Sequence, residues 1–254
     1  MPIIKIVSRL AKILLPFLLL LLLWQMIVSC FAIPHYLLAT PKAVLEQLWT
    51  QHQLLLMHSQ VTLIEILLGL LCGFALGLTS ALILSMSKQL RALLLPIFVL
   101  SQAIPVFAIA PLLVLWFGYG ISSKIVMAIL IIYFPVTAAC FDGLRNTPKQ
   151  WLELAQTMQI SPLNCLLKVK LPAALPSLAS GLRIATSIAP IGAIVGEWVG
   201  SSSGLGYLML QANARMQVDL MFSALFLLML MALTLYFFVD FTLKRLIPWA
   251  SHLQ

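Results

Sequence analysis

The chain has 254 residues, of which 62% are hydrophobic and only 9% are charged. Soluble globular domains are about 45–50% apolar and about 25% charged, so this composition excludes a soluble protein and places most of the chain in lipid. The net charge of +8 does not indicate nucleic-acid binding, because the basic residues form no single stripe and lie between the apolar runs.

Six runs are long and apolar enough to cross a membrane, which takes about 20 residues. They predict an all-α polytopic membrane protein in which residues 1–254 form a single transmembrane domain. The first run follows Lys5, Arg9 and Lys12 and is too long for a cleaved signal peptide, so we expect a retained helix. The predicted spans are 13–33, 59–84, 93–117, 124–141, 177–200 and 218–243.

The distribution of Lys and Arg predicts the orientation of these spans. If the N-terminus lies in the cytoplasm, twelve basic residues face inward and three, Lys42, Lys124 and Arg215, face outward. Cytoplasmic segments carry the excess of Lys and Arg in membrane proteins. We therefore expect both termini in the cytoplasm.

Two outer segments are more apolar than ordinary loops. Residues 42–56 predict an amphipathic helix in the membrane interface. Residues 201–217 are expected to dip partly into the membrane, which is possible where protein or water covers their backbone.

Glycines recur at every fourth position in two places. The rows are Gly69, Gly73 and Gly77 in span two, and Gly192, Gly196, Gly200 and Gly204 in and after span five. This spacing makes one helix face smooth, so that another backbone can approach it closely. We interpret the first row as helix packing. The second row either packs in the same way or lies beside a path for solute.

Polar residues at membrane depth are functional candidates by default. Gln102 lies in span three among prolines that predict a kinked helix, namely Pro96, Pro105 and Pro111. Glu65 lies about two turns into span two, and Glu197 lies near the outer end of span five. The residues expected to line a translocation path are Glu197, Gln102, Glu65, Gly196 and Gly200.

The longest segment between spans, 142–176, predicts a helical hairpin on the cytoplasmic side. Thr147 is the expected N-cap of its first helix, and Ser161 and Pro162 are expected to start its second. Pro172 and Pro176 are expected to end the second helix. One apolar face is predicted on the first helix, formed by Trp151, Leu154, Ala155 and Met158. An exposed apolar face usually marks a partner surface.

The sequence lacks the motifs that would make this chain an enzyme. No G-x-x-x-x-G-K-[ST] motif occurs, so any ATP that drives the protein must bind to another chain. The cysteines and histidines show no metal-ligand spacing, and neither a cofactor nor a catalytic residue is predicted. Residues 200–204 match G-x-S-x-G, but they lie at the end of an apolar helix rather than in a strand-to-helix turn.

Two stretches of the hairpin resemble a known family. Glu153-Leu154-Ala155, followed by the stretch from Leu171 and Pro172 to Ser177, resembles the "EAA" coupling loop of binding-protein-dependent ABC importer permeases. That loop usually has a glycine shortly after its core, where this chain has Gln159.

The resemblance extends over most of the chain. Residues 105–118 (PVFAIAPLLVLWFG) and 196–206 (GEWVGSSSGLG) resemble the nitrate/sulfonate/taurine branch of these permeases. Residues 196–222 are most similar to permeases assigned to hydroxymethylpyrimidine, a thiamine precursor.

This resemblance implies a type I ABC importer permease in the bacterial inner membrane. It implies a homodimer, or a pair with a close relative, together with two ATP-binding subunits and an extracytoplasmic solute-binding protein. The partner subunits would use the ATP. The residues that it implies for coupling to the ATPase are Trp151, Glu153, Leu154, Ala155, Met158, Gln159, Leu171 and Pro172.

Three other functions remain open at this stage. A permease of the same branch could carry nitrate, a sulfonate or taurine, although the outer half has few cationic groups. An ion-coupled secondary transporter would usually show inverted repeats, and none is clear here. A membrane-embedded enzyme would have to use Ser202 of the G-x-S-x-G match.

Overall fold

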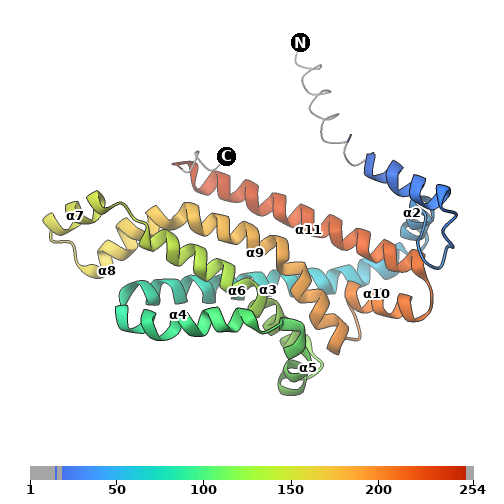
Figure 1. Cartoon of the computed structure of the whole chain (residues 1–254), viewed down its shortest axis with the longest axis horizontal. Coiled ribbons are helices and arrows are strands. Elements are labelled where there is room, and N and C mark those ends of the chain that lie inside the picture. Colours follow the sequence, from blue (N-terminus) through green and yellow to red (C-terminus); the bar gives the residue numbers. More distant parts are fainter. Residues whose placement is uncertain (1–14, 16–18, 250–254) are drawn as a thin grey trace, which may run out of the picture.

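The computed structural model describes residues 15 and 19–249, and the regular structure in these residues is helical (Figure 1). Four helices are long and apolar enough to cross a membrane, namely α3 (His52–Met86), α6 (Ile121–Arg145), Pro162–Gly200, which includes α9 (Leu171–Gly200), and α11 (Val218–Leu246). The other elements are α2 (Pro41–Thr50), α4 (Lys88–Ala103), α5 (Val106–Phe117), α7 (Lys149–Thr157), α8 (Pro162–Cys165), the π-helical turn η1 (Leu166–Lys170) and α10 (Leu205–Ala214). The predicted first span, 13–33, lies partly outside the described residues, and its described part contains the apolar helix Leu19–Cys30.

The predicted third span, 93–117, is divided between α4 and α5. The break lies at Ile104, whose backbone is extended (φ −86°, ψ 119°), immediately before Pro105. A proline ring disfavours the helical conformation of the preceding residue, which explains the break at this position. Pro96 and Pro111 lie inside α4 and α5, so Pro105 alone divides the span.

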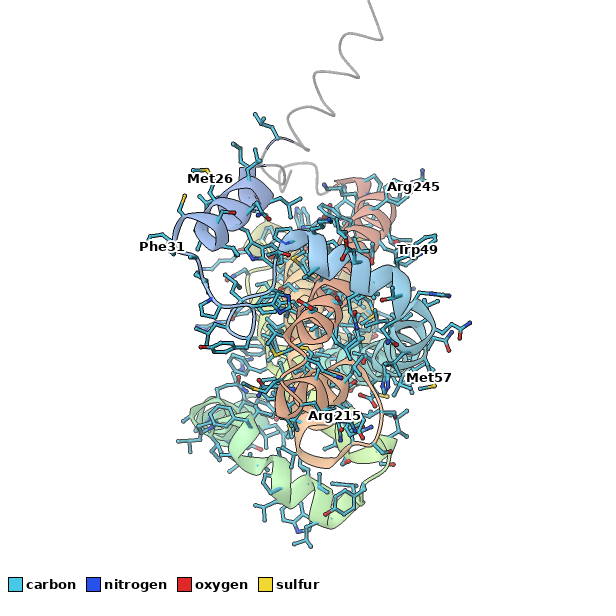
Figure 2. The ribbon with its side chains drawn as sticks, turned by 90° about the vertical axis from the view of Figure 1, so that its right-hand side faces the viewer. Met26, Phe31, Trp49, Met57, Arg215 and Arg245 are labelled. Atoms are coloured by element: carbon cyan, nitrogen blue, oxygen red, sulfur yellow. The ribbon has the colours of Figure 1, made fainter. Side chains whose placement is uncertain are left out.

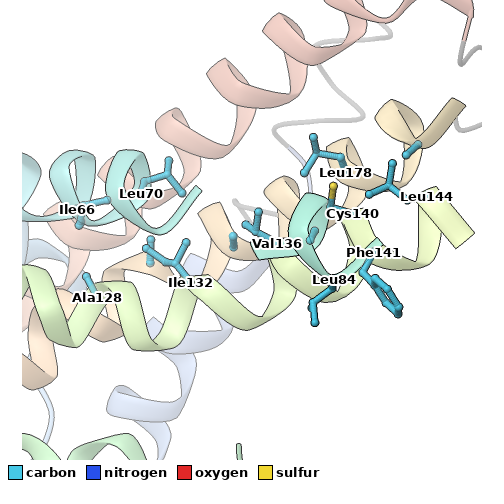
Figure 3. Packing of buried hydrophobic residues seen from close by; sticks show 14 of the residues in the cluster. Ile66, Leu70, Leu84, Ala128, Ile132, Val136, Cys140, Phe141, Leu144 and Leu178 are labelled. Carbon is cyan, nitrogen blue, oxygen red and sulfur yellow. The ribbon is translucent and has the colours of Figure 1, made fainter. Parts of the chain in front are cut away.

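The core of the molecule lies where α3, α6 and α9 pack against one another. Figure 3 shows the apolar side chains between them, with Ile66 and Leu70 from α3 and Ala128, Ile132 and Val136 from α6. All of these side chains are buried. The three helices therefore form the rigid centre around which the other elements are arranged.

Glycine allows the close approach of these helices. A Cβ atom at Gly73 would lie 2.8 Å from Cγ2 of Ile132, so the interpretation of the first glycine row as helix packing is confirmed. The second row packs in the same way, because a Cβ atom at Gly192 would lie 2.8 Å from Cα of Ala128. Gly192, Gly196 and Gly200 of the second row therefore lie at contacts between helices, as the first row does.

The two ends of the bundle carry different elements. Figure 1 shows α7 and α8 at one end, and α2 and α10 at the other. Figure 2 looks onto the second end, where Met26, Phe31, Trp49 and Met57 point outward from the bundle. These side chains are between 57% and 83% exposed, which suits a surface in contact with lipid. From the predicted orientation, the α7–α8 end is the cytoplasmic end, and the α2–α10 end is the outer end.

The two outer segments fold as short helices. The predicted helix 42–56 divides at Gln51 into α2 and the first turn of α3, and Thr40 caps α2 by accepting a hydrogen bond from the amide of Ala43 (3.2 Å). Segment 201–217 contains α10, which buries one face against α3, α9 and α11. Protein therefore covers that face of the segment.

Candidate functional site

The cytoplasmic end presents the predicted apolar face. Trp151, Leu154 and Met158 are 51%, 61% and 65% exposed. The first two lie on α7, and Met158 is the residue that caps its C-terminus. Leu163 and Leu167, from the second half of the hairpin, are also exposed. Ala155 lies at the buried edge of this face, because it is 4% exposed and lines a cavity beneath the hairpin. We call Trp151, Leu154 and Met158 the coupling face.

The turn between the two hairpin helices depends on Gln159. This residue has a left-handed backbone (φ 54°), and the next amide, of Ile160, donates to the carbonyl of Ala155 (3.1 Å). This is the usual way in which a helix ends with a left-handed residue, and glycine is the residue most often found there. Ser161 then caps α8 by accepting from the amide of Asn164 (3.4 Å). The left-handed backbone of Gln159 agrees with the glycine that the resemblance leads us to expect at this point of the loop.

Two expected boundaries of the hairpin are wrong. Thr147 does not cap α7, because its hydroxyl donates to the carbonyl of Leu144 (3.0 Å) and α7 begins after Pro148. Pro172 and Pro176 do not end the second helix, which continues from α8 through η1 into α9. A proline removes the usual helical donor, but the wider π-helical turn just before Pro172 changes the hydrogen-bond register and accommodates the ring.

The other predicted coupling residues lie near this face or at its base. Glu153 is exposed on α7, and its carbonyl accepts a hydrogen bond from the hydroxyl of Thr157 (3.0 Å). Leu171 and Pro172 are half-buried at the start of α9. The second half of the hairpin and the fifth span are therefore parts of one continuous helix, Pro162–Gly200, of 39 residues.

The outer end of the bundle contains a second site, a cluster of buried polar side chains. It joins α3, α6 and α9, and each of its ionisable members is at most 5% exposed. Lys124 forms an ion pair with Glu65 (Nζ to Oε1, 2.9 Å) and donates to the hydroxyl of Ser201 (2.6 Å). We call this set the outer polar cluster, and it consists of His58, Thr62, Glu65, Lys124, Glu197 and Ser201.

The outer polar cluster holds the N-terminus of α10. Glu197 accepts hydrogen bonds from the amides of Gly206 and Tyr207, and its other carboxylate oxygen accepts one from the hydroxyl of Thr62 (2.6 Å). The amide of Leu205 donates to the same Thr62 oxygen (2.8 Å). The first amides of a helix have no partner within the helix, and a carboxylate there also interacts favourably with the helix dipole. Side chains of α3 and α9 therefore fix where α10 begins.

Gly204 is required at this junction for two reasons. Its backbone (φ 110°, ψ 163°) lies in a region that is open essentially to glycine alone, and a Cβ atom would collide with the carboxylate of Glu197. Its amide also donates to Nδ1 of His58 (3.0 Å). Although the spacing of the sequence placed Gly204 in a packing row, its role in the structure is to allow the sharp turn into α10.

We expect Gly204→Ala to destabilise the purified protein by several kcal/mol, because backbone strain of about 1–3 kcal/mol adds to the collision with Glu197. Gly118 is a matched control, since its φ is 79° and a Cβ atom there would meet nothing within 4 Å. Gly118→Ala should lower the stability of the protein only by the backbone strain. Thermal unfolding in detergent measures both changes, and equal losses would contradict the role assigned to Glu197.

The structure brings together two of the predicted path residues and places the others elsewhere. Glu65 and Glu197 are 0% and 1% exposed and meet in the outer polar cluster. Gly196 and Gly200 are buried where α9 packs against α6 and α5. Gln102 lies on α4, outside the cluster, with an exposed side chain. The two glutamates and the two glycines are therefore all surrounded by residues of the same chain.

Sequence reasoning missed four members of the cluster, namely His58, Thr62, Lys124 and Ser201. One available signal was the spacing of residues 58, 62 and 65, which places three polar side chains on one face of α3 within an apolar span. Lys124 had been counted as an outward-facing charge, whereas it is 5% exposed and paired with Glu65.

Comparison with known proteins identifies related sequences over most of the chain. The sequence model of one family, described as "Binding-protein-dependent transport system inner membrane component", matches residues 66–252. A probable ABC transporter permease protein of Haemophilus influenzae is 68% identical over 228 residues, which cover 90% of this chain and 93% of that protein.

Two further relatives have names that include a solute. The formylaminopyrimidine transport permease protein of Halalkalibacterium halodurans is 34% identical and matches 92% of this chain and 93% of its own length. The riboflavin transport system permease protein of Chloroflexus aurantiacus is 36% identical and matches 92% of this chain and 88% of its own length.

A solved structure confirms the predicted fold. A chain of the MetNI methionine ABC transporter, in an inward-facing conformation, superimposes with a TM-score of 0.67 at 21% identity. The match covers 80% of this chain and 98% of that chain. The prediction of an all-helical polytopic membrane protein is therefore confirmed.

Proposed function

Because this chain belongs to the family of binding-protein-dependent transport system inner membrane components, we propose that it imports a pyrimidine of the thiamine-precursor class. The chain is a multi-pass permease of the inner membrane and forms part of an ABC importer. It lies in the nitrate/sulfonate/taurine-like branch, since permeases named for aliphatic sulfonates and taurine also match it. ATP is used by a separate subunit, and the permease itself uses no cofactor.

The coupling face is the observation that carries the proposed mechanism. It presents three large exposed apolar side chains at the end predicted to be cytoplasmic, outside the predicted spans. An apolar patch that faces water marks a protein interface, and aromatic anchors such as Trp151 often dominate its affinity. We therefore assign this face to the ATP-binding subunit.

The continuous helix Pro162–Gly200 supplies a mechanical link between the two ends. It starts in the hairpin, passes through the core and ends at Gly200, next to the outer polar cluster. A rotation imposed on the hairpin by closure of the ATPase pair would be transmitted along this helix to Glu197 and α10. In this mechanism ATP binding opens the pathway outward, and hydrolysis resets the inward-facing state.

The complete importer in this proposal has two permease chains, either two copies of this one or one copy and a close relative. Two ATP-binding subunits dock on the hairpins, and a solute-binding protein docks at the outer face. The pathway forms between the permease chains. Glu65 and Glu197 are buried at the outer end, so these two of the proposed path residues would act through α10.

The solute class can be tested by uptake into proteoliposomes. The permease, its ATP-binding subunit and its solute-binding protein are reconstituted, and ATP-dependent uptake of radiolabelled hydroxymethylpyrimidine is measured. We expect uptake that unlabelled formylaminopyrimidine inhibits and taurine does not. Uptake of taurine or nitrate in place of the pyrimidine would contradict the proposal.

One observation favours the alternative of a nitrate, sulfonate or taurine permease. Arg215 is exposed in the turn after α10 at the outer end (Figure 2), where a cation could meet an anionic solute. The uptake experiment separates the two solute classes. The third possibility, an ion-coupled secondary transporter, does not agree with membership of a binding-protein-dependent family.

A further inference from the structure

The outer end contains a polar cavity separate from the buried ion pair. It has a volume of about 340 Å³ and lies between the α2–α3 corner, α10 and the start of α11. Small-molecule sites have volumes of about 300–1,000 Å³ and combine apolar walls with a few convergent polar groups. This cavity has the same composition, since leucine side chains lie beside four glutamines, a histidine and a tyrosine.

His58 lines this cavity and carries one hydrogen-bond donor. Its Nδ1 accepts from the amide of Gly204 (3.0 Å), so the neutral ring carries its proton on Nε2. The side chain is 5% exposed and lines the cavity, and its Nε2 has no hydrogen-bond partner among the residues that the structure describes. This donor is therefore available as a recognition group.

Tyr207 supplies the second recognition group. Its ring lies over that of His58, with centroids 6.0 Å apart and an interplanar angle of 29°. Its hydroxyl accepts a hydrogen bond from the amide of Gln211 (3.0 Å), which leaves the hydroxyl proton for another acceptor. Both residues line the cavity, so it has two aromatic rings and two donors in its wall.

The charge of the lining restricts the ligand. Among the described lining residues there is no carboxylate, and the one fixed charge, Arg215, is exposed. The glutamines Gln47, Gln51, Gln211 and Gln217 each offer a donor and an acceptor. Amides of this kind pair with the alternating donors and acceptors on the edge of a nitrogen heterocycle. They do not neutralise an ion.

We propose that this cavity is a receiving site for the solute, which takes an uncharged, planar nitrogen heterocycle after its release from the binding protein. This inference rests on the proposed function. It adds a site within a single permease chain, with His58 and Tyr207 as recognition residues. Because His58 also bonds to Gly204, an occupied cavity contacts the outer polar cluster directly.

The test is equilibrium binding of radiolabelled hydroxymethylpyrimidine to the permease–ATPase complex in lipid nanodiscs. The solute-binding protein is left out, because it would bind the probe itself. Two histidine variants separate the two ring nitrogens. His58→Asn keeps an acceptor near Nδ1 for Gly204 and loses the Nε2 donor, whereas His58→Gln keeps a donor near Nε2 and loses the acceptor.

We expect saturable binding to the unmodified complex and an affinity about tenfold lower in both His58→Asn and Gln211→Leu, the loss typical of one hydrogen bond. His58→Gln should bind more tightly than His58→Asn. Gln60→Leu is the matched control, because Gln60 is exposed on α3 and does not line the cavity. Its affinity should be unchanged.

Three results would overturn the assignment: no binding to the unmodified complex, equal affinities in all variants, or taurine binding that is lost in Arg215→Gln. The uptake experiment separates this inference from the proposed function. If the complete importer takes up the pyrimidine but the complex in nanodiscs does not bind it, the receiving site is contradicted and the proposed function stands. Binding without uptake by the complete importer contradicts the proposed function.

Discussion

Replacing Lys124 by methionine should destabilise the purified permease by about 3–5 kcal/mol. The change leaves Glu65, which is 0% exposed and lies 2.9 Å from the Lys124 ammonium, without its cation. Removing one partner of a buried ion pair leaves an uncompensated charge, which accounts for a loss of this size. Thermal unfolding in detergent, together with the yield of folded protein in size-exclusion chromatography, measures the effect.

The double variant Lys124→Met/Glu65→Met should recover most of this stability. Replacing a whole buried pair by apolar side chains is often neutral or stabilising. Lys42→Met is the matched control, because the Lys42–Glu46 pair is 3.6 Å apart and its side chains are 85% and 65% exposed. That variant should lose less than about 1 kcal/mol. If the single and double variants are equally unstable, the ion pair is not what stabilises the cluster.

Replacing Trp151 by alanine should weaken binding of the ATP-binding subunit by about 30-fold or more. This factor corresponds to about 2 kcal/mol, a typical loss for an aromatic anchor at an interface. ATP-dependent uptake should fall with it, while insertion and thermal stability of the permease remain unchanged. Affinity is measured by titrating the ATP-binding subunit onto permease held in nanodiscs.

Trp49→Ala provides the control for this prediction. Trp49 is also an exposed tryptophan, at 83%, but it lies on α2 at the opposite end of the bundle. Its loss should leave the affinity for the ATP-binding subunit unchanged. An unaltered affinity in Trp151→Ala, or an equal loss in the two variants, would exclude the coupling face as the docking surface.

The cytoplasmic hairpin could be predicted in outline because its signals are local. Ser161 and Pro162 start α8 as expected, and the apolar positions of α7 followed the helical period. The continuation through Pro172 could not be predicted, since the π-helical turn that accommodates it depends on the register of the whole Pro162–Gly200 helix. Ala155 was misplaced because periodicity identifies an apolar face, but it does not show which edge of that face packs.

Only two of the six members of the outer polar cluster could be predicted from the sequence. Glu65 and Glu197 were noted because charges in apolar runs are conspicuous. Their partners come from other helices and belong to ordinary residue types, and no local pattern joins Lys124 to Glu65 or Thr62 to Glu197. Contacts between residues this far apart in the chain become evident only when α3, α6 and α9 are packed together.

The most direct test of the account is photo-cross-linking from the coupling face. A photoreactive amino acid replaces Leu154, which is 61% exposed, and the complex is irradiated in inside-out membrane vesicles that contain the ATP-binding subunit. We expect a covalent adduct between permease and ATP-binding subunit, and no such adduct when the same amino acid replaces Trp49. An adduct from position 49 in place of position 154, or lipid adducts alone at position 154, would contradict it.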